Sequence, residues 1–461
     1  MAIRVYDTKS RSKREFETLE DGKVKMYVCG ITPYSPSHLG HARCYIAFDV
    51  VHRWLEASGF EVDYVQNFTD IDDQIIEISE SEEVTFEVVA NRNIEEYFEV
   101  MDRMNVLRAD SYPRVTETIP EIIVMVESLI EKGHAYLADD GVYFEIDSAP
   151  EKYGLLTGQT LEMVREGAGG RVSETGSGKK NHRDFALWKF ARKDEPSWTS
   201  PWGEGRPGWH IECSAMSLKH FGEQFDIHGG GHDLRFPHHE AEIFQSECST
   251  GCEPVVGFWM HNGFVNVDGE KMSKSLGNFW NVSDLFERHA PLALRYALLS
   301  VPYRNPIDLT PEFLEDAADH YERLVGAYSR SLTSGDSGTD MTGVSELFRD
   351  AMDDDFNTRS AIIEVQKVVS LGTSKGVASW LEEHAGNILG LLPSREEVIA
   401  AQEEAHTARV GISEKVEVLL SQRDEARGAH DWGRADQIRD ELASMGVIVE
   451  DGSDGPTWRL G

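Results

Sequence analysis

VKMYVCGITPYSPSHLGHARCYIAFDVVHRWLEASGFEVDYVQNF, residues 24–68, contains the pattern that decides the fold. Residues 24–29 alternate apolar and polar side chains, as a strand does, and run into a turn-rich segment with two prolines. From Ser37, a residue type that caps helices, apolar residues recur at helical spacing up to Gly59, and FEVDYVQNF then predicts a second strand. Strand, helix and strand in this order predict a βαβ unit with a parallel sheet.

Length and composition indicate a folded protein of several domains. The 461 residues are 40% hydrophobic and 27% charged, which is typical of globular chains of about 100–200 residues per domain. No apolar run reaches about 18 residues, so we expect no membrane span and no secretory signal, and a cytoplasmic location. The five scattered cysteines do not form a disulfide framework, so metal binding or plain burial must explain them.

The net charge of −36 argues at first against a nucleic-acid partner, since phosphate backbones are normally met by basic surface. The acidic residues are spread along the whole chain. We interpret this excess as adaptation to a salt-rich, halophilic cytosol. At molar salt the Debye length is about 3 Å, so global repulsion of a polyanion is largely screened and a nucleic-acid partner stays open.

The periodicity changes along the chain and predicts an α/β protein in several parts. Between the first βαβ unit and the strand signal QFDIHGGG lies a Gly/Ser-rich stretch, REGAGGRVSETGSGKKNHRD, which we interpret as a mobile loop within an insertion. After about residue 310 the pattern becomes helical. The expected parts are a split Rossmann-type domain (1–112 and 206–310), an insertion (113–205), a helical bundle (311–398) and a C-terminal module (399–461).

The sequence HLGH stands where the first strand hands over to the first helix. Helix N-termini of this kind bind phosphate, and His38 and His41 can both face the anion from the first turn. Gly40 between them lets a nucleotide approach the backbone closely. Two ordinary surface histidines remain the alternative at this point.

KMSKS, residues 271–275, offers Lys271 and Lys274 together with two hydroxyls on a loop. Such a loop suits a triphosphate whose charge rises as the α-phosphorus is attacked. A solvated basic turn is the alternative, but lysine is scarce in this chain. HLGH and KMSKS in this order, about 230 residues apart, are specific as a pair.

With both motifs present, the chain resembles the class I aminoacyl-tRNA synthetases, and over essentially its whole length the cysteinyl-tRNA synthetases among them. KMSKS matches without change, and Leu39 replaces the isoleucine usual in the first motif. The resemblance implies a Rossmann-type catalytic domain with an inserted connective peptide, followed by a helical bundle and a small anticodon-binding module.

A zinc site is also implied. FPHHEAEI places His238 and Glu242 four residues apart on one face of a helix begun at Pro237. Together with two thiolates, this imidazole and carboxylate suit zinc. Their spacing in the sequence does not by itself place Cys29 and Cys213 in one site. Each cysteine could instead be a small hydrophobic residue buried in the core. In the family that the chain resembles, the positions of Cys29, Cys213, His238 and Glu242 hold a zinc ion, and we expect one per chain. His239 projects about 100° away from His238 on the helix, so we interpret it as a neighbour and not a ligand.

The resemblance further implies roles for pocket residues and for the last module. Gly30, Thr69, Trp209 and His228 would contact the substrate cysteine, and Asp233 would contact ATP. In the C-terminal module, Arg427, Trp432, Arg434 and Asp436 are residue types that stack on and hydrogen-bond unpaired anticodon bases. Without the resemblance, an amphipathic helical hairpin with ordinary surface charges is the favoured explanation.

These features predict a cysteine–tRNA ligase acting on ATP, L-cysteine and tRNA(Cys), with Mg²⁺ bound to ATP, and we expect a monomer. Zinc would select thiol over hydroxyl by factors of about 10⁴–10⁵ without editing. Two alternatives remain: a related ligase that passes cysteine to an amino sugar, which lacks an anticodon module, and a catalytically inactive paralogue that only binds tRNA.

Overall fold

The computed structural model describes residues 2–159, 178–267, 269–271, 280–335, 340–452 and 455–460. The chain folds into two compact units, Met1–Leu392 and Pro393–Gly461. The four-part division expected above, with its boundaries, stays a prediction. Most of the Gly/Ser-rich stretch interpreted as a mobile loop lies outside the described residues, as do residues 272–279 of the KMSKS region.

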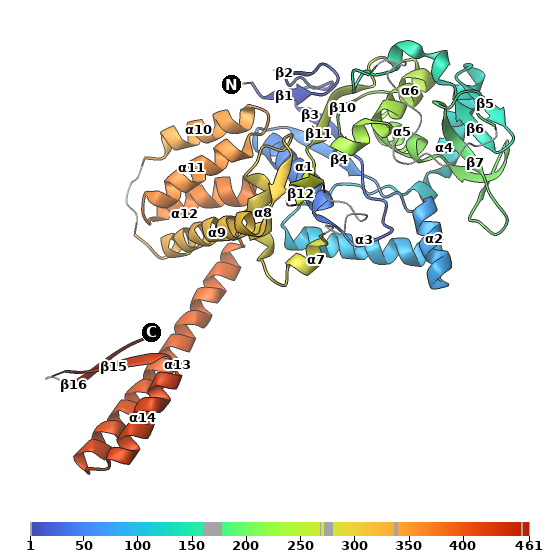
Figure 1. Ribbon diagram of the computed structural model, residues 1–461. Coiled ribbons are helices and arrows are strands. Elements are labelled where there is room, and N and C mark those ends of the chain that lie inside the picture. Colours follow the sequence, from blue (N-terminus) through green and yellow to red (C-terminus); the bar gives the residue numbers. More distant parts are fainter. Residues whose placement is uncertain are drawn as a thin grey trace. The chain divides into compact units, whose positions relative to one another are not determined.

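A four-stranded parallel sheet forms the centre of the first unit (Figure 1). Its strand order is β11-β10-β3-β4, with β3 Lys23–Val28, β4 Glu61–Gln66, β10 Phe225–Gly231 and β11 Val256–Asn262. Helix α1, Leu39–Ala57, connects β3 to β4, which pair in parallel from Lys23 opposite Glu61 to Val28 opposite Gln66. The predicted βαβ unit is therefore confirmed.

The strand order reverses between β3 and β10. From β3 the chain moves outward to β4, and from β10 it moves outward in the opposite direction to β11. In parallel sheets, ligands bind at the carboxyl ends of the strands on either side of such a reversal. The segments that follow β3, β4 and β10 are thus the place to look for a site.

Helix α1 begins one residue later than the sequence indicated. Its N-cap is His38, not Ser37: the imidazole of His38 accepts from the backbone N–H of His41, and the ring of His41 accepts from the N–H of His38. This reciprocal arrangement satisfies two N–H groups that would otherwise lack partners. The histidines of HLGH therefore also build the helix terminus.

Both faces of the sheet are covered. On one face, helices α4 (Ile119–Glu131), α5 (Trp209–Phe221) and α6 (His238–Thr250) share a core with Tyr27, Val65, Phe225 and Trp259 of the strands. On the other face, α1 packs so closely that a Cβ on Gly229 would lie 2.3 Å from the ring of Phe48. Glycine in β10 permits this approach.

The segment between β4 and β10 contains a five-stranded antiparallel sheet with the order β5-β6-β7-β9-β8. Its strands are β5 Ala135–Ala138, β6 Gly141–Phe144, β7 Phe185–Phe190, β8 Trp198–Ser200 and β9 Gly203–Pro207. The same segment holds helices α2 (Asp73–Glu82) and α3 (Phe86–Arg103) and the 3₁₀ turns Val115–Glu117, Ile146–Ser148 and Pro150–Lys152.

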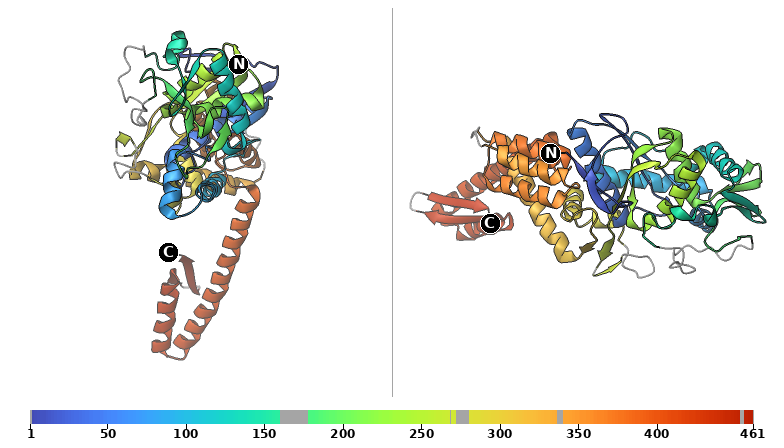
Figure 2. Two further views of the ribbon diagram at one scale, coloured as in Figure 1. Left: turned by 90° about the vertical axis from the view of Figure 1, so that its right-hand side faces the viewer. Right: turned by 90° about the horizontal axis from the view of Figure 1, so that it is seen from above.

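Beyond Leu309 the chain becomes mainly helical, as predicted for the segment after about residue 310. A small sheet of β12 (Val265–Val267), β13 (Glu270–Lys271) and β14 (Ile307–Leu309) and the helices α7 (Val282–Leu285) and α8 (Pro291–Leu299) precede the bundle. Figure 2 shows α9–α12 side by side at one end of this unit and the insertion at the other. The bundle comprises α9 Pro311–Leu332, α10 Thr342–Asp353, α11 Thr358–Ser370, α12 Lys375–Leu381 and a π-helix, Glu382–Ile388.

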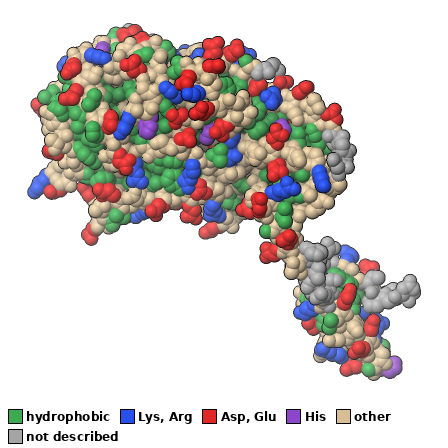
Figure 3. All heavy atoms as spheres, turned by 180° about the vertical axis from the view of Figure 1, so that it is seen from behind, with side chains coloured by type: hydrophobic (Ala, Val, Ile, Leu, Met, Phe, Trp, Pro, Cys, Tyr) green, Lys and Arg blue, Asp and Glu red, His purple; other side chains and the backbone are tan. Residues whose placement is uncertain are grey.

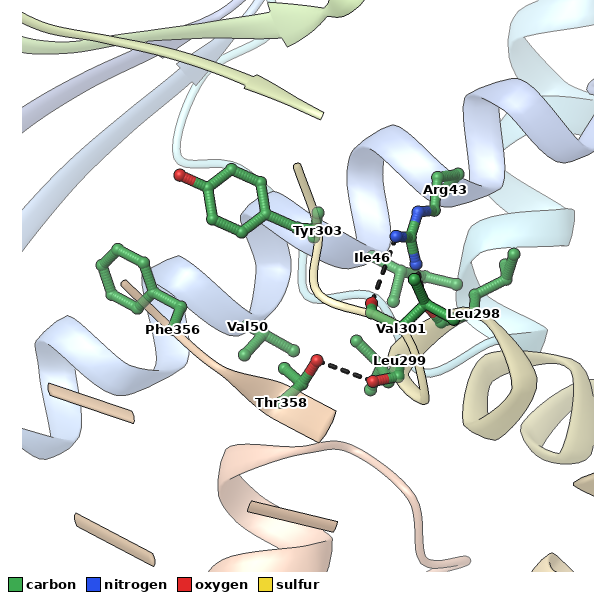
Figure 4. A pocket seen from close by; sticks show the side chains of 10 residues that line it. Arg43, Ile46, Val50, Leu298, Leu299, Val301, Tyr303, Phe356 and Thr358 are labelled. Atoms are coloured by element: carbon green, nitrogen blue, oxygen red, sulfur yellow. Dashed lines mark hydrogen bonds between the residues drawn. The ribbon is translucent and has the colours of Figure 1, made fainter. Parts of the chain in front are cut away.

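The bundle joins the parallel sheet's layer through α1 and α8 (Figure 4). There Arg43 of α1 donates to the carbonyl of Val301, and the hydroxyl of Thr358, the first residue of α11, donates to the carbonyl of Leu299 at 2.6 Å. The side chains between them enclose only a small, largely apolar cavity. This joint is a packing contact rather than a ligand site.

The second unit consists of α13 (Arg395–Gly428), α14 (Trp432–Ser444) and the hairpin β15–β16 (Val447–Gly452 and Gly455–Leu460). Its small core contains Val416, Leu419, Leu420, Ile438, Leu442 and Val447. In the part of the chain that the structure describes, no helix is long and apolar enough to cross a membrane.

Candidate metal centre and active site

A cluster of metal-ligating side chains lies at the carboxyl ends of β3 and β10. Cys29 follows β3, Cys213 comes from α5, and His238 and Glu242 come from the first two turns of α6. One ligand atom from each of these four residues lies within 4.8 Å of the others, and all four residues are buried. The structure thus brings together the four residues predicted to hold zinc.

The distances inside this cluster are those of side chains around a common centre. The Sγ atoms of Cys29 and Cys213 are 3.6 Å apart, and Cys29 Sγ lies 3.7 Å from Glu242 Oε1. His238 Nε2 lies 3.2 Å from the same carboxylate oxygen, as the i, i+4 spacing predicts. Two sulfurs, one imidazole nitrogen and one carboxylate oxygen are donors that suit a tetrahedral zinc ion, so the residues fit that metal.

A second set of side chains overlaps the first. Cys29 and Glu242 also lie near His228 and His239, with ligand atoms again within 4.8 Å of one another. His239 Nε2 is 3.3 Å from Cys29 Sγ, and His228 Nε2 is 3.1 Å from Glu242 Oε2. His239 projects about 100° away from His238 around the helix, yet it still lies within the cluster. That it is a neighbour of the metal ligands and not a ligand itself stays a prediction.

Burial controls the protonation of these groups. Burial raises the pKa of Cys29 well above its usual range, and the nearby Cys213 and Glu242 add to that effect. Burial likewise lowers the pKa of His239 well below its usual range, so its imidazole is neutral. The neutral thiol of Cys29 and the neutral imidazole of His239, both buried, keep their lone pairs for a cation, whose charge would favour the thiolate form.

Three of the residues predicted to contact cysteine surround the cluster. Gly30 follows Cys29, Thr69 is buried three residues beyond β4, and His228 in β10 is fully buried against Glu242. Trp209, the fourth, is half-buried at the start of α5, with its ring centroid 4.5 Å from that of His238. His228 and Trp209 thus lie directly beside the predicted metal ligands Glu242 and His238, at the reversal of strand order.

The HLGH residues lie at the same edge of the sheet. The rings of His38 and His41 stack with centroids 3.6 Å apart, and Gly40 lies between them in the first turn of α1. The chain that follows the KMSKS region pairs with this turn: Leu39 N–H donates to Trp280 O, and Val282 N–H donates to Ser37 O. Residues 280–282, which follow the KMSKS region, therefore lie beside the first turn of α1.

The remaining predicted nucleotide contacts are only partly described. Asp233 lies exposed in the 3₁₀ turn His232–Arg235, immediately after β10. The backbone of Lys271 pairs with Asn266 in the β12–β13 hairpin, but its side chain, like the whole of Lys274, lies outside the described part of the chain.

The predicted anticodon contacts lie in the second unit. Arg427 is near the end of α13, and Trp432, Arg434 and Asp436 occupy the first turns of α14. Trp432 is 58% exposed, as a stacking platform must be, whereas Asp436 forms an ion pair with Arg439 at 3.0 Å.

Two residues of the site were missed from the sequence. Asn67, in the stretch 24–68 quoted above, is buried, and its side chain hydrogen-bonds both Gly30 and Thr69. Glu212, next to Cys213, is buried, and burial together with the charge of Asp72 raises its pKa well above the usual range. The position of Asn67 directly after a strand at the carboxyl edge was the signal that could have identified it; Glu212 offered none.

Comparison with known proteins identifies the family. Residues 15–319 match the model of the tRNA synthetases class I (C) catalytic domain, and residues 409–459 match the cysteinyl-tRNA ligase anticodon binding domain. The chain is 45% identical to a cysteine–tRNA ligase of Haemophilus influenzae, with 99% of each chain covered. It is 43% identical to that of Geobacter sulfurreducens and 44% identical to that of Oceanobacillus iheyensis, with full coverage of both chains in each case.

Solved structures show the same fold at low identity. A methionyl-tRNA synthetase of Mycobacterium tuberculosis superposes with a TM-score of 0.58 at 15% identity, over 82% of this chain and 87% of that one. A leucyl-tRNA synthetase of Agrobacterium radiobacter gives 0.58 at 12% identity, over 84% and 86%. With the sequence matches over its full length, the chain belongs to the cysteine–tRNA ligases, enzymes of the class I aminoacyl-tRNA synthetase fold that form aminoacyl-tRNA.

Proposed function

We propose that this enzyme activates L-cysteine with ATP to cysteinyl-adenylate and transfers it to the 3′-terminal adenosine of tRNA(Cys), using zinc to select the thiol. The observation that carries the proposal is the buried cluster of Cys29, Cys213, His238 and Glu242 beside the pocket residues. Its relatives named cysteine–tRNA ligases support the amino acid and the acceptor.

Cys29, Cys213, His238 and Glu242 would hold one zinc ion per chain. When bound, zinc supplies a position that prefers a thiolate over the hydroxyl of serine. The chain's own part is to hold these four donors close together in a dry pocket and to keep Thr69 and Trp209 beside them. Selection would then need no editing step.

Adenylate formation joins the cysteine carboxylate to the α-phosphorus of ATP and releases pyrophosphate. His38 and His41, stacked at the N-terminus of α1, would stabilise charge on the phosphates, where helix N–H groups also point. Gly40 would let the nucleotide approach, Asp233 would contact it, and Mg²⁺ would arrive bound to ATP. Lys271 and Lys274 would follow the departing pyrophosphate, whose charge grows in the transition state.

The second step transfers cysteine from the adenylate to a ribose hydroxyl of the tRNA, releasing AMP. The match of residues 409–459 to an anticodon binding domain favours tRNA over an amino sugar as the acceptor. Arg427, Trp432 and Asp436 would contact the anticodon. We also propose that the enzyme acts as a monomer in the cytoplasm.

The test is cysteine-dependent exchange of pyrophosphate into ATP, followed by charging of tRNA with labelled cysteine. We expect exchange with cysteine and about 10⁴-fold less with serine at equal concentration. Exchange without tRNA charging would point to the amino-sugar ligase, and the absence of any exchange would point to an inactive tRNA-binding protein.

A further inference from the structure

Asn67 is a buried amide in the first residues after β4, and it bonds in two directions. Its Oδ1 accepts from the backbone N–H of Gly30 at 2.8 Å, and its Nδ2 donates to the hydroxyl of Thr69 at 3.4 Å. The residue is 1% exposed, so water does not compete for these bonds. One side chain thus holds both Gly30, after β3, and Thr69, after β4.

The same amide reaches the metal cluster. Cys213 Sγ lies 3.7 Å from Asn67 Oδ1, although Cys213 comes from α5, far along the chain. The backbone is locked at the same point, since a Cβ on Gly30 would lie 1.5 Å from the carbonyl oxygen of Asn67. Asn67 therefore contacts a predicted metal ligand and two predicted pocket residues at once.

We propose that Asn67 is the positioning residue that aligns the amino-acid pocket with the metal ligand Cys213. The inference rests on the proposed function, because it assigns Thr69 and Gly30 to the substrate pocket and Cys213 to the metal. Asn67 itself touches neither substrate nor ATP in this role. It acts by fixing Thr69 and Gly30 relative to the sulfur.

Only a carboxamide satisfies all of these contacts. The N–H of Gly30 is a donor, so it requires an oxygen, and this requirement orients the amide with Nδ2 toward Thr69. The hydroxyl of Thr69 accepts from Nδ2 and donates its own hydrogen bond to the carboxyl group of Glu212. An aliphatic side chain would lose both bonds and leave the N–H of Gly30 without its partner.

The experiment compares four variants with the wild-type chain: Asn67→Ala, Thr69→Val, the double variant, and Gln66→Met as a control. Gln66 is the last residue of β4, is 2% exposed, and bonds Tyr97 at 2.6 Å and Tyr64 at 3.1 Å, away from the cluster. It therefore matches Asn67 in burial and in lost hydrogen bonds. Zinc affinity is measured by competition with a chelator, and kcat and KM for cysteine and for ATP by pyrophosphate exchange.

For Asn67→Ala we expect a KM for cysteine raised at least tenfold, a KM for ATP unchanged within twofold, and zinc affinity lowered about 10- to 100-fold. The double variant should be no worse in KM for cysteine than the poorer single variant, because Asn67 acts through Thr69. Gln66→Met should lower the thermal midpoint by about as much as Asn67→Ala does. It should leave the KM for cysteine and the zinc affinity near their wild-type values.

Either of two results would overturn the inference: zinc affinity in Asn67→Ala equal to that of Gln66→Met, or effects of Asn67→Ala and Thr69→Val on KM that simply multiply. Either result would mean that Asn67 stabilises the fold and does not align the pocket with Cys213. If the wild-type chain shows no cysteine-dependent exchange, the proposed function fails instead, and the zinc affinities of the variants still decide whether Asn67 positions Cys213.

Discussion

Two buried polar clusters in the first unit differ in how their charges are balanced. One is the cluster of Cys29, Cys213, His238 and Glu242, which we call the zinc cluster after the metal proposed for it. The other, which we call the arginine knot, consists of Asp49 and Arg53 of α1 and Arg295 of α8. Both clusters are almost completely excluded from water, so desolvation makes an unbalanced charge costly in either.

In the arginine knot the partners are all supplied by the chain. Both guanidinium groups contact the carboxylate of Asp49, Arg53 at 2.9 Å. Arg295 also donates to the carbonyls of Leu389 and Met104, and Arg53 to the carbonyl of Asn387. Burial alone would raise the pKa of Asp49, but Arg295 and Arg53 outweigh it and hold that pKa below its usual range.

In the zinc cluster the partners are all electron-pair donors. The two thiols, the carboxylate and the imidazoles form two overlapping sets, and within each set one ligand atom per residue lies within 4.8 Å of the others. The comparison distinguishes two uses of buried polarity. The knot closes on itself and holds α1, α8 and the end of the π-helix together, whereas the zinc cluster is arranged for a cation that comes from outside.

Asp49→Ala should give the largest effect, a loss of about 3–5 kcal/mol in the free energy of unfolding, because two arginines are left buried without their carboxylate. Chemical denaturation measures it. The control is Asp102→Ala, which removes an exposed partner of Arg108 and should cost less than about 1 kcal/mol. Equal losses in the two variants would contradict the role given to the knot.

The knot also predicts the sign of a pH effect. Since the pKa of Asp49 is lowered in the folded chain, its contribution is fully present above the unfolded-state pKa near 4 and is lost as pH falls through the lower folded value. Stability should therefore fall less steeply below about pH 4 in Asp49→Ala than in the wild type.

Cys213→Ser should lower zinc affinity about 100-fold. A four-ligand zinc site contributes about 10–16 kcal/mol, so one ligand accounts for roughly 3 kcal/mol. Metal analysis and chelator competition measure the change, with Cys248→Ser as the control, since Cys248 is buried in α6 outside the cluster. Survival of both zinc content and cysteine affinity in Cys213→Ser would show that the site is misassigned.

A smaller difference in zinc affinity should show which of the two overlapping ligand sets holds the metal. If His238 is the ligand, His238→Ala should lose about tenfold more zinc affinity than His239→Ala, which removes a residue that bonds His261 at 2.8 Å and lies 3.3 Å from Cys29 Sγ without ligating the metal. The reverse order would assign the metal to the set that contains His239 and His228. Both histidines lie in the first turn of α6, so effects on helix stability are matched.

The sequence predicted those parts of the site that depend on local geometry. The βαβ unit followed from strand and helix periodicity, and the His238–Glu242 pair from helical spacing. The contact of Cys29 with Cys213 depends on β3 lying beside β10, which no local pattern contains, and only the family resemblance joined them. The knot was missed for the same reason, since Asp49 and Arg295 are 246 residues apart.

Salt should affect the surface while leaving both buried clusters unchanged. The net charge is −36, and Figure 3 shows acidic side chains spread over the visible face rather than gathered in one patch. Raising KCl from about 0.1 M to 1 M shortens the Debye length from about 10 Å to 3 Å and screens repulsion between these carboxylates. We therefore expect a rise of a few degrees in the thermal midpoint, the smallest of the effects predicted here.

The loss caused by Asp49→Ala should be the same at both salt concentrations, within about 0.5 kcal/mol, because the buried carboxylate is beyond the reach of screening ions. The charging rate should hold steady or rise, since recognition by stacking and hydrogen bonding depends less on salt than contacts to phosphates do. A steady fall in both thermal midpoint and charging rate would contradict salt adaptation. A strong salt dependence of the Asp49→Ala loss would instead show that the knot is open to solvent, and the contrast between a cluster that pairs its own charges and one proposed to need a metal would fail.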